Sequence, residues 1–335
     1  MHKRTAIKFG VILVLAVAAT GLILVLRQSP FCRMKSGTAP DSRASFAWPA
    51  MGTVAEFEAV GDAAVAGRMR NVVADAIAEV EDELSAFKPE SVVNRLTHGD
   101  VDVPEGSHAA VVLRFALQIA ESSGGAFDPT VGPLMRAWGF RGGVPAVPSD
   151  AVLSNALAGV GWRHVSVTPS TIGRLRISAG GAEIDLGAIA KGYAVDLAYE
   201  RLVEAHHTDF LINLGGNIRV CGSPEPERKE WNIAVRDPSG RHPPSPLPRP
   251  LRSGEAVATS GSYERFVEIN GRRYSHIIDP RTGIPVDNGL GSVSVIAPTA
   301  MEADACSTTL FVLGRKAGAT FLAARLGCTA VFIEQ

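Results

Sequence analysis

The stretch DLGAIAKGYAVD, residues 185–196, gathers a carboxylate, two glycines and a lysine where an apolar segment ends and a helical pattern begins. Gly187 allows the backbone to approach a neighbour closely, and apolar positions from Ile189 onward recur at helical spacing. Taken alone, the stretch is better explained as an ordinary strand-to-helix connection with Asp185 as the helix cap. Taken with the segments below, the stretch predicts a ligand-facing turn that leads into a helix.

Composition indicates a folded globular protein. The chain has 335 residues, of which 46% are hydrophobic, enough for one large domain or two closely packed subdomains. The formal net charge of -1 gives no general attraction for nucleic acid, which is therefore not expected as a partner. The cysteines show neither metal-ligand spacing nor a disulfide framework, and they leave the redox compartment open: Cys32, Cys221, Cys306 and Cys328.

The N-terminus predicts export of the remainder of the chain. A basic segment at 1–8, expected in the cytoplasm, precedes an uncharged run at 9–26 that is about 27 Å long as a helix and can span a bilayer. We expect this run to be a signal anchor; a cleavable signal peptide is the alternative, although its candidate Ala-x-Ala site at 16–18 lies inside the run. A linker at 27–45 then leads to one folded domain at 46–335.

Hydrophobic periodicity predicts helices and short strands in mixed order after the linker. Helices are expected at 63–87, 91–96, 108–122, after Pro129, from Ile189, at 300–313 and at 315–326. Strands are expected from Val54, around Val165, and at 175–177, 182–184, 209–214, 218–221, 256–259, 263–269, 273–278, 291–296 and 329–333. The proline-rich segment at 237–250 is expected to be a stiff surface insertion between strands.

A candidate metal site lies on the helix expected at 300–313. Asp304 and Thr308 are four residues apart, so their oxygens project from one helix face, with Ser307 beside them. A carboxylate with hydroxyl groups is a hard oxygen set that suits Mg²⁺. One carboxylate needs further ligands from elsewhere in the chain, and a helix-start cap is the alternative role for Asp304.

Two further residues are candidates for chemistry or binding. His276 stands at the end of an expected strand, before a charged turn, where it could act as a general base; a structural histidine is the alternative. Asp128 either caps a helix that begins at Pro129 or contacts a ligand at that helix start. The sequence contains no nucleophile elbow and no HExxH, so a covalent nucleophile is not expected.

Together these segments resemble the ApbE family of FAD:protein FMN transferases, also called flavin transferases. The resemblance follows the family's order through 50–53, 85–94, 126–140, 185–196, 213–217, 258–265, 276–283 and 303–314. It implies an α+β fold of mixed, largely antiparallel sheets with packed helices, in two intimate subdomains with the flavin site between them. It also implies a bacterial enzyme on the periplasmic face of the inner membrane, or in the periplasm if the N-terminal segment is cleaved.

The activity implied by the resemblance is a Mg²⁺-dependent transfer. The FMN half of FAD passes to a threonine hydroxyl of an acceptor protein, such as a subunit of a membrane redox complex, through a phosphoester bond, and AMP is released. FAD is then the substrate and Mg²⁺ the cofactor. Two alternatives stay open: FAD hydrolysis to FMN and AMP, and FAD binding by an exported protein without catalysis. The base and metal candidates argue against the binder, since storing FAD needs neither.

The resemblance also assigns roles to individual residues. The implied FAD contacts are Met51, Phe87, Ala126, Phe127, Asp128, Asp185, Lys191 and Ile278. Phe87 stands where the family more often has Tyr or Trp, so it keeps stacking capacity without a polar group. The implied metal ligands are the Ala188 carbonyl, Asp304, Thr308 and Ser307, the last at a position where some relatives have Asp. His276 matches the family histidine proposed to deprotonate the acceptor threonine.

Overall fold

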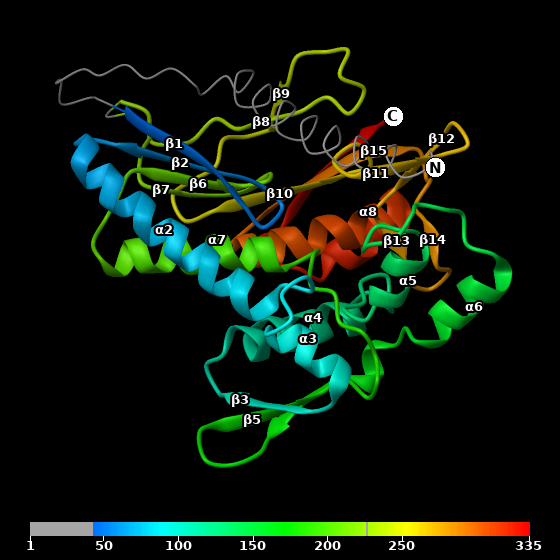
Figure 1. The fold of residues 1–335 in the computed structure, drawn as a ribbon. Helices are drawn as coiled ribbons and strands as arrows, with labels where there is room; N and C mark the ends of the chain where they lie inside the picture. The colour runs from blue at the N-terminus through cyan, green and yellow to red at the C-terminus, as the bar shows by residue number, and fades with distance from the viewer. Residues whose placement is uncertain (1–42, 226) are drawn as a thin grey trace, which may run out of the picture.

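The computed structural model describes residues 43–225 and 227–335, and it confirms the expected α+β fold. Its largest layer is a seven-stranded antiparallel sheet made, in sheet order, of β1 (Arg43–Ala50), β2 (Thr53–Val60), β6 (Phe210–Leu214), β7 (Asn217–Cys221), β10 (Ala256–Gly261), β15 (Leu290–Ala297) and β16 (Thr329–Glu334). One face of this sheet is covered by α2 (Ala63–Leu84), α7 (Ala190–Glu204) and α8 (Ala300–Ala323) (Figure 1). The main apolar core lies between the sheet and these helices.

Helix α2 shows how the sequence pattern builds this core. Asp62 caps its N-terminus, because Oδ1 accepts hydrogen bonds of 2.9 Å from the backbone N–H groups of Ala64 and Val65. The buried positions recur every three or four residues: Ala66, Met69, Val73, Ala76, Ile77, Val80 and Leu84. The helix ends at Leu84, before the expected end at 87, since Ser85 already has an extended backbone. Residues 85–91 therefore form a loop.

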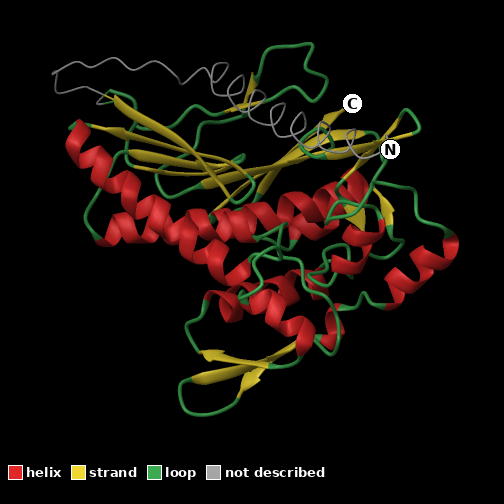
Figure 2. Ribbon diagram, in the orientation of Figure 1, coloured by secondary structure: helices red, strands yellow, loops and turns green. Residues whose placement is uncertain are grey.

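A second, smaller group of elements packs against the other side of the helices (Figure 2). It contains α3 (Val92–Arg95), α4 (His108–Ser122), α5 (Gly132–Ala137), α6 (Asp150–Ala158), and 3-10 turns at Leu96–His98 and Trp162–His164. Its small antiparallel sheet has the order β3 (Val101–Pro104), β5 (Arg174–Ser178) and β4 (Ser166–Pro169). Two short hairpins follow β10 in the chain: β11 (Phe266–Ile269) with β12 (Arg272–Ser275), and β13 (Ile278–Asp279) with β14 (Ile284–Pro285).

The proline-rich insertion covers the other face of the large sheet. Between β7 and β10 the chain forms a minimal hairpin of β8 (Ala234–Val235) and β9 (Ser245–Pro246). Trp231 and Leu251 of this segment pack with Val257 and Ile296, whose side chains point away from the helices. The expected insertion at 237–250 itself contributes Leu247 to this second apolar cluster, whereas Trp231 and Leu251 flank it.

Several elements differ from the expectation. The strand expected at 182–184 is wrong: the segment is buried, but it forms no ladder, and the next residue, Asp185, bonds through its N–H to the Pro129 carbonyl at 2.8 Å. Helix α6 and strand β3 were not expected. The expectation of two helices at 300–313 and 315–326 is confirmed within α8, because Gly314, with a φ of 72°, interrupts the helical backbone between them; only the end differs, since α8 stops at Ala323.

The predicted N-terminal segments at 1–8 and 9–26 lie outside the described residues. Within the described ranges, no helix is both long and apolar enough to cross a membrane. Strand β1 begins at Arg43, so the last residues of the linker predicted at 27–45 belong to the large sheet.

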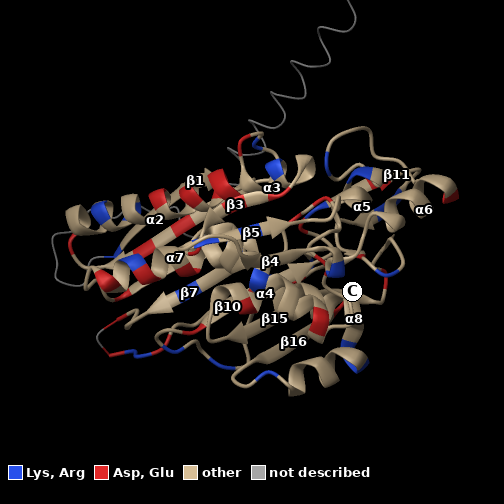
Figure 3. Ribbon diagram, turned by 90° about the horizontal axis from the view of Figure 1, so that it is seen from below, with Lys and Arg blue, Asp and Glu red and all other residues tan. Residues whose placement is uncertain are grey.

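Charged residues of both signs are interspersed over the elements that Figure 3 presents. Acidic residues are grouped along α2 and α7. This distribution agrees with the formal net charge of -1 for the whole chain.

Candidate active site

The predicted ligand-facing turn lies directly before α7. Asp185 does not cap the helix, since the N-cap residue is Ile189. Instead, Asp185 closes a tight turn in which its Oδ1 accepts a 2.9 Å hydrogen bond from the Gly187 N–H. No donor among the described residues reaches its Oδ2, so one carboxylate oxygen stays open. The capping explanation considered for Asp185 is therefore wrong.

The Ala188 carbonyl in this turn has no backbone partner within the described part of the chain. The Leu186 carbonyl accepts from both Ile189 and Ala190, at 3.1 and 2.9 Å, and helical bonding then starts with the Ile189 carbonyl. The Gly192 N–H, four residues after Ala188, donates to Asp304 Oδ2 at 3.0 Å instead. A carbonyl oxygen is thus left open at the helix start.

Asp304 of α8 meets this turn and is buried, with only 5% of its surface exposed. Besides the Gly192 N–H, its Oδ2 faces the Lys191 ammonium at 3.9 Å. Among the described residues, no hydrogen-bond donor reaches Oδ1. Burial raises the pKa of Asp304, and Lys191 and the Gly192 N–H oppose that rise. Residue 192 must be glycine because a Cβ there would collide with the Ala300 carbonyl and with Asp304.

The hydroxyl groups beside Asp304 form a chain whose direction follows from counting protons. Ser307 donates to the Asp304 backbone carbonyl at 2.9 Å, so its one proton is used. Ser260 must therefore donate to Ser307 at 2.8 Å, and Thr308 must donate to Ser260 at 3.0 Å. Thr308 Oγ1 is left with lone pairs that can face a cation. The fully buried Ser307 hydroxyl is already engaged on both sides.

The helices α7 and α8 are held together by Asp196, the last residue of the opening stretch. Its carboxylate accepts 2.8 Å hydrogen bonds from the N–H groups of Ala300 and Met301 and pairs with Arg219 at 2.8 Å. Burial raises its pKa to about 6 although Arg219 opposes the rise. Sequence reasoning missed this role, for which the only signal was an acid one helical turn beyond Gly192.

Glu264, in the turn after β10, is a second acid that sequence reasoning missed. Its side chain reaches solvent, but protein surrounds the carboxylate closely enough to raise its pKa to about 7. The charge of Lys191 opposes this rise, and the charge of Asp304 adds to it. Glu264 therefore belongs to the same charged group as the α7–α8 contact.

His276 presents one free ring nitrogen. Its Nδ1 lies 2.9 Å from the Arg265 carbonyl, which can only accept, so Nδ1 carries the proton in the neutral ring. No donor or acceptor among the described residues contacts Nε2. Burial and then the nearby Arg265 charge lower the pKa of His276 to about 4. At neutral pH the imidazole is uncharged, with an Nε2 lone pair available to take a proton.

The remaining predicted flavin contacts lie on separate segments. Met51 has a φ of 46° in the two-residue turn between β1 and β2, and Phe87 is 68% exposed in the 85–91 loop. Ala126, Phe127 and Ile278 are buried, with Ile278 in a small cluster against α5. These three side chains pack inside the protein, so only their backbones can meet a ligand.

Asp128 does not have the predicted role of a helix cap, and its side chain is engaged within the protein. Helix α5 begins at Gly132 with Val131 as its N-cap, so Asp128 does not cap it. Its Oδ1 accepts from the N–H and the hydroxyl of Thr130, at 2.8 and 2.6 Å, and its Oδ2 accepts from the Trp162 N–H at 3.0 Å. Both carboxylate oxygens are thus committed to holding the 126–130 turn.

The open oxygens fit a small hard cation. No group of three His, Cys, Asp or Glu side chains that could hold a metal occurs in the described ranges. A cation here would instead use the Ala188 carbonyl, Asp304 Oδ1 and Thr308 Oγ1, which come from the contact between the α7 turn and α8. An all-oxygen set with one carboxylate suits Mg²⁺, which keeps several waters.

Comparison with known proteins extends over all these segments. The chain matches the model of the ApbE family over residues 51–332. An FAD:protein FMN transferase of Treponema pallidum is 38% identical over 267 residues, covering 75% of this chain and 72% of that protein. An FAD:protein FMN transferase of Klebsiella pneumoniae is 34% identical over 268 residues, covering 77% of this chain and 80% of that protein. Among solved structures, an ApbE protein of Thermotoga maritima aligns with a TM-score of 0.78 at 31% identity, covering 88% and 94%. The apo form of Pseudomonas stutzeri flavinyl transferase ApbE aligns with a TM-score of 0.75 at 30% identity, covering 90% of this chain and 93% of that protein.

Proposed function

The chain belongs to the ApbE family, and we infer from this premise that it is an FAD:protein FMN transferase. We further propose that the acceptor group is a threonine hydroxyl, that AMP is the leaving product, and that Mg²⁺ is required. The observation that carries the proposal is the joint occurrence of open oxygens at the α7–α8 contact and a neutral imidazole with a free Nε2.

The pyrophosphate of FAD is proposed to lie over the α7–α8 contact. Asp304, Thr308 and the Ala188 carbonyl would hold Mg²⁺, which when bound supplies charge neutralisation to the phosphates. Lys191 lies 3.9 Å from Asp304 and adds a fixed positive charge beside them. We assign Ser307, the fourth predicted ligand, to orienting Ser260, and through it Thr308, because its hydroxyl is already engaged.

His276 is proposed as the general base. Its Nε2 takes the proton of the acceptor threonine as that oxygen attacks the phosphorus of the FMN half. The new O–P bond forms while the P–O bond to AMP breaks, so the negative charge of the leaving oxygen departs on the AMP phosphate. The imidazolium that results still donates through Nδ1 to the Arg265 carbonyl, which keeps the ring in place.

The flavin end is proposed to lie between the 85–91 loop and the turn before α7. Phe87 offers an exposed aromatic face, and Asp185 offers one open carboxylate oxygen. Ala126, Phe127, Asp128 and Ile278 would take part through their backbones, and Met51 through the β1–β2 turn.

We propose that the transferase domain faces the periplasm and is anchored by residues 9–26. The support is the apolar run and its basic flank in the sequence. An anchored enzyme would reach acceptors at the same membrane, such as a subunit of a membrane redox complex.

The test is incubation of the full-length protein with FAD, Mg²⁺ and an acceptor protein that carries the threonine. Flavin fluorescence that stays on the acceptor in a denaturing gel, with AMP release, supports transfer. A Thr→Ala acceptor and a reaction with EDTA are the controls. Free FMN without a labelled acceptor would show hydrolysis instead, and unchanged FAD would show a binding protein.

A further inference from the structure

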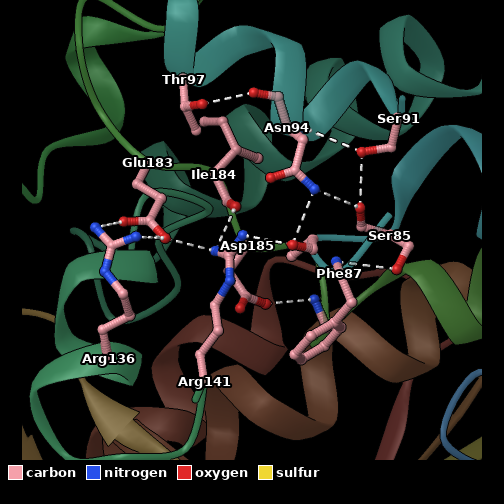
Figure 4. A network of polar contacts seen from close by, with 12 residues as sticks. Ser85, Phe87, Ser91, Asn94, Thr97, Arg136, Arg141, Glu183, Ile184 and Asp185 are labelled. Atoms are coloured by element: carbon pink, nitrogen blue, oxygen red, sulfur yellow. Dashed lines mark hydrogen bonds and ion pairs between the residues drawn. The ribbon is translucent and has the colours of Figure 1, made fainter. Parts of the chain in front are cut away.

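Arg141 connects two segments that are distant in the sequence and adjacent in the candidate site (Figure 4). Its Nη2 donates to the Ala86 carbonyl at 2.9 Å, and its Nη1 donates to the Ile184 carbonyl at 3.3 Å. The same guanidinium pairs with the buried Glu183 at 2.8 Å. The Arg141 side chain is only 10% exposed, so these contacts are made inside the protein.

The two carbonyls immediately precede two proposed flavin contacts. Ala86 is followed by Phe87, the exposed aromatic residue, and Ile184 is followed by Asp185, which has one open oxygen. One planar guanidinium therefore fixes the separation between the Phe87 loop and the Asp185 turn. Among the described residues, the other donor to the Ala86 carbonyl is the Asn94 amide, which makes no hydrogen bond to the Asp185 segment.

The internal shape of the 85–91 loop has a separate origin. The Asn94 side-chain amide donates to the carbonyls of Ser85, Ala86 and Lys88, at 3.4, 3.0 and 2.7 Å. Asn94 belongs to α3, which follows the loop directly in the chain. Asn94 thus shapes the loop locally, while Arg141 sets where the loop lies relative to Asp185.

We propose that Arg141 is a positioning residue for the isoalloxazine ring. It acts by holding the Phe87 loop at a fixed distance from the Asp185 turn. The inference rests on the proposed function, since it takes Phe87 and Asp185 as flavin contacts. Arg136 provides a matched control: it also pairs with Glu183, but it is 59% exposed and bonds neither carbonyl.

The experiment compares Arg141→Met, Arg141→Lys and Arg136→Met in the full-length protein. Without any ligand, hydrogen exchange at the Phe87 and Lys88 amides should be faster in Arg141→Met by about tenfold and unchanged in Arg136→Met. The Kd for FAD, from quenching of flavin fluorescence, should rise about tenfold in Arg141→Met. In transfer assays its KM for FAD should rise more than its kcat falls. Arg141→Lys keeps the positive charge beside Glu183 but lacks the planar guanidinium that bonds two carbonyls at once. Its Kd for FAD should therefore lie between those of Arg141→Met and wild type.

Two outcomes would overturn the inference. If Arg136→Met weakens FAD binding as much as Arg141→Met, the effect comes from the Glu183 charge and not from the bridge. If Arg141→Lys binds FAD like wild type, charge alone suffices; this mild variant decides the question should Arg141→Met fold poorly. Failure of the proposed function would look different, because wild-type protein would then bind FAD without transferring FMN, or not bind it at all.

Discussion

The 126–130 turn and the α7–α8 contact each contain a buried carboxylate, and the two have opposite surroundings. Asp128 accepts three hydrogen bonds, and both of its oxygens are used by Thr130 and Trp162. Asp304 accepts one backbone hydrogen bond on Oδ2, and no donor in the described part of the chain reaches Oδ1. Burial does not distinguish them, since Asp128 is 8% and Asp304 5% exposed.

The difference shows that the number of donors, not the depth, separates a carboxylate that holds the fold from one that can bind a ligand. A buried oxygen without a donor costs free energy in the unliganded protein, and a bound cation can recover it. For Asp304 the cost is that of desolvation, since burial of the carboxylate raises its pKa. His276 resembles Asp304 in this respect, because its Nδ1 is engaged and no described residue bonds its Nε2.

The largest expected effect is that of Asp304→Asn on transfer. The amide replaces the open anionic oxygen, so we expect FMN transfer to fall by about a thousandfold or more. Without Mg²⁺, the free energy of unfolding should stay the same or rise by about 1 kcal/mol, because a buried charge is removed. Transfer assays and urea unfolding in EDTA measure the two. Retained transfer with Mg²⁺ present would show that the metal assignment is wrong.

His276→Ala should have the next largest effect. Loss of the general base is expected to slow transfer by about a hundredfold or more while the Kd for FAD changes by less than about threefold. Single-turnover transfer and fluorescence titration with FAD give the two values. Equal losses in transfer rate and in affinity for FAD would make His276 a binding residue and not a general base.

Asp128→Asn should lower stability and leave the Mg²⁺ requirement of transfer unchanged, the reverse of what is expected for Asp304→Asn. The new amide places a donor group opposite existing donors, the Thr130 hydroxyl or the Trp162 N–H, so the protein should lose about 1–3 kcal/mol of stability. The Mg²⁺ concentration for half-maximal transfer should not change. Thermal unfolding and Mg²⁺ titration check both statements. A changed Mg²⁺ requirement at unchanged stability would contradict the distinction drawn between the two acids.

The sequence predicted the parts of this arrangement that lie within one element. Helices α2 and α4 were expected because their apolar positions recur over many turns, and Asp304 and Thr308 were paired by their helical spacing. Helix α6 was missed because it buries only Ala156 and so has almost no periodic signal. The Ser260 contact with Thr308 joins residues 48 positions apart, and no local pattern encodes such a contact.

A last expected effect is the pH dependence of stability that His276 contributes. Its pKa is lowered to about 4 in the folded protein from an ordinary 6.5, so the unfolded chain takes up the proton first as pH falls. This contribution is fully present above about pH 6.5 and is lost between there and about pH 4, by at most about 1.4 kcal/mol per pH unit.

Asp196 acts in the opposite direction over an overlapping window. Its pKa is raised to about 6 from 3.8, so the folded protein takes up that proton first and gains stability as pH falls. The raised pKa of Glu264, about 7, acts in the same direction as that of Asp196. The wild-type curve therefore mixes opposing contributions, and only a difference between variants isolates that of His276. Urea unfolding of wild type and His276→Gln from pH 7 to pH 4.5 should show the wild type losing stability relative to the variant. Parallel curves would mean that the His276 ring can be charged without cost in the folded protein. His276 would then not share with Asp304 the penalty of placing a charge in a desolvated position.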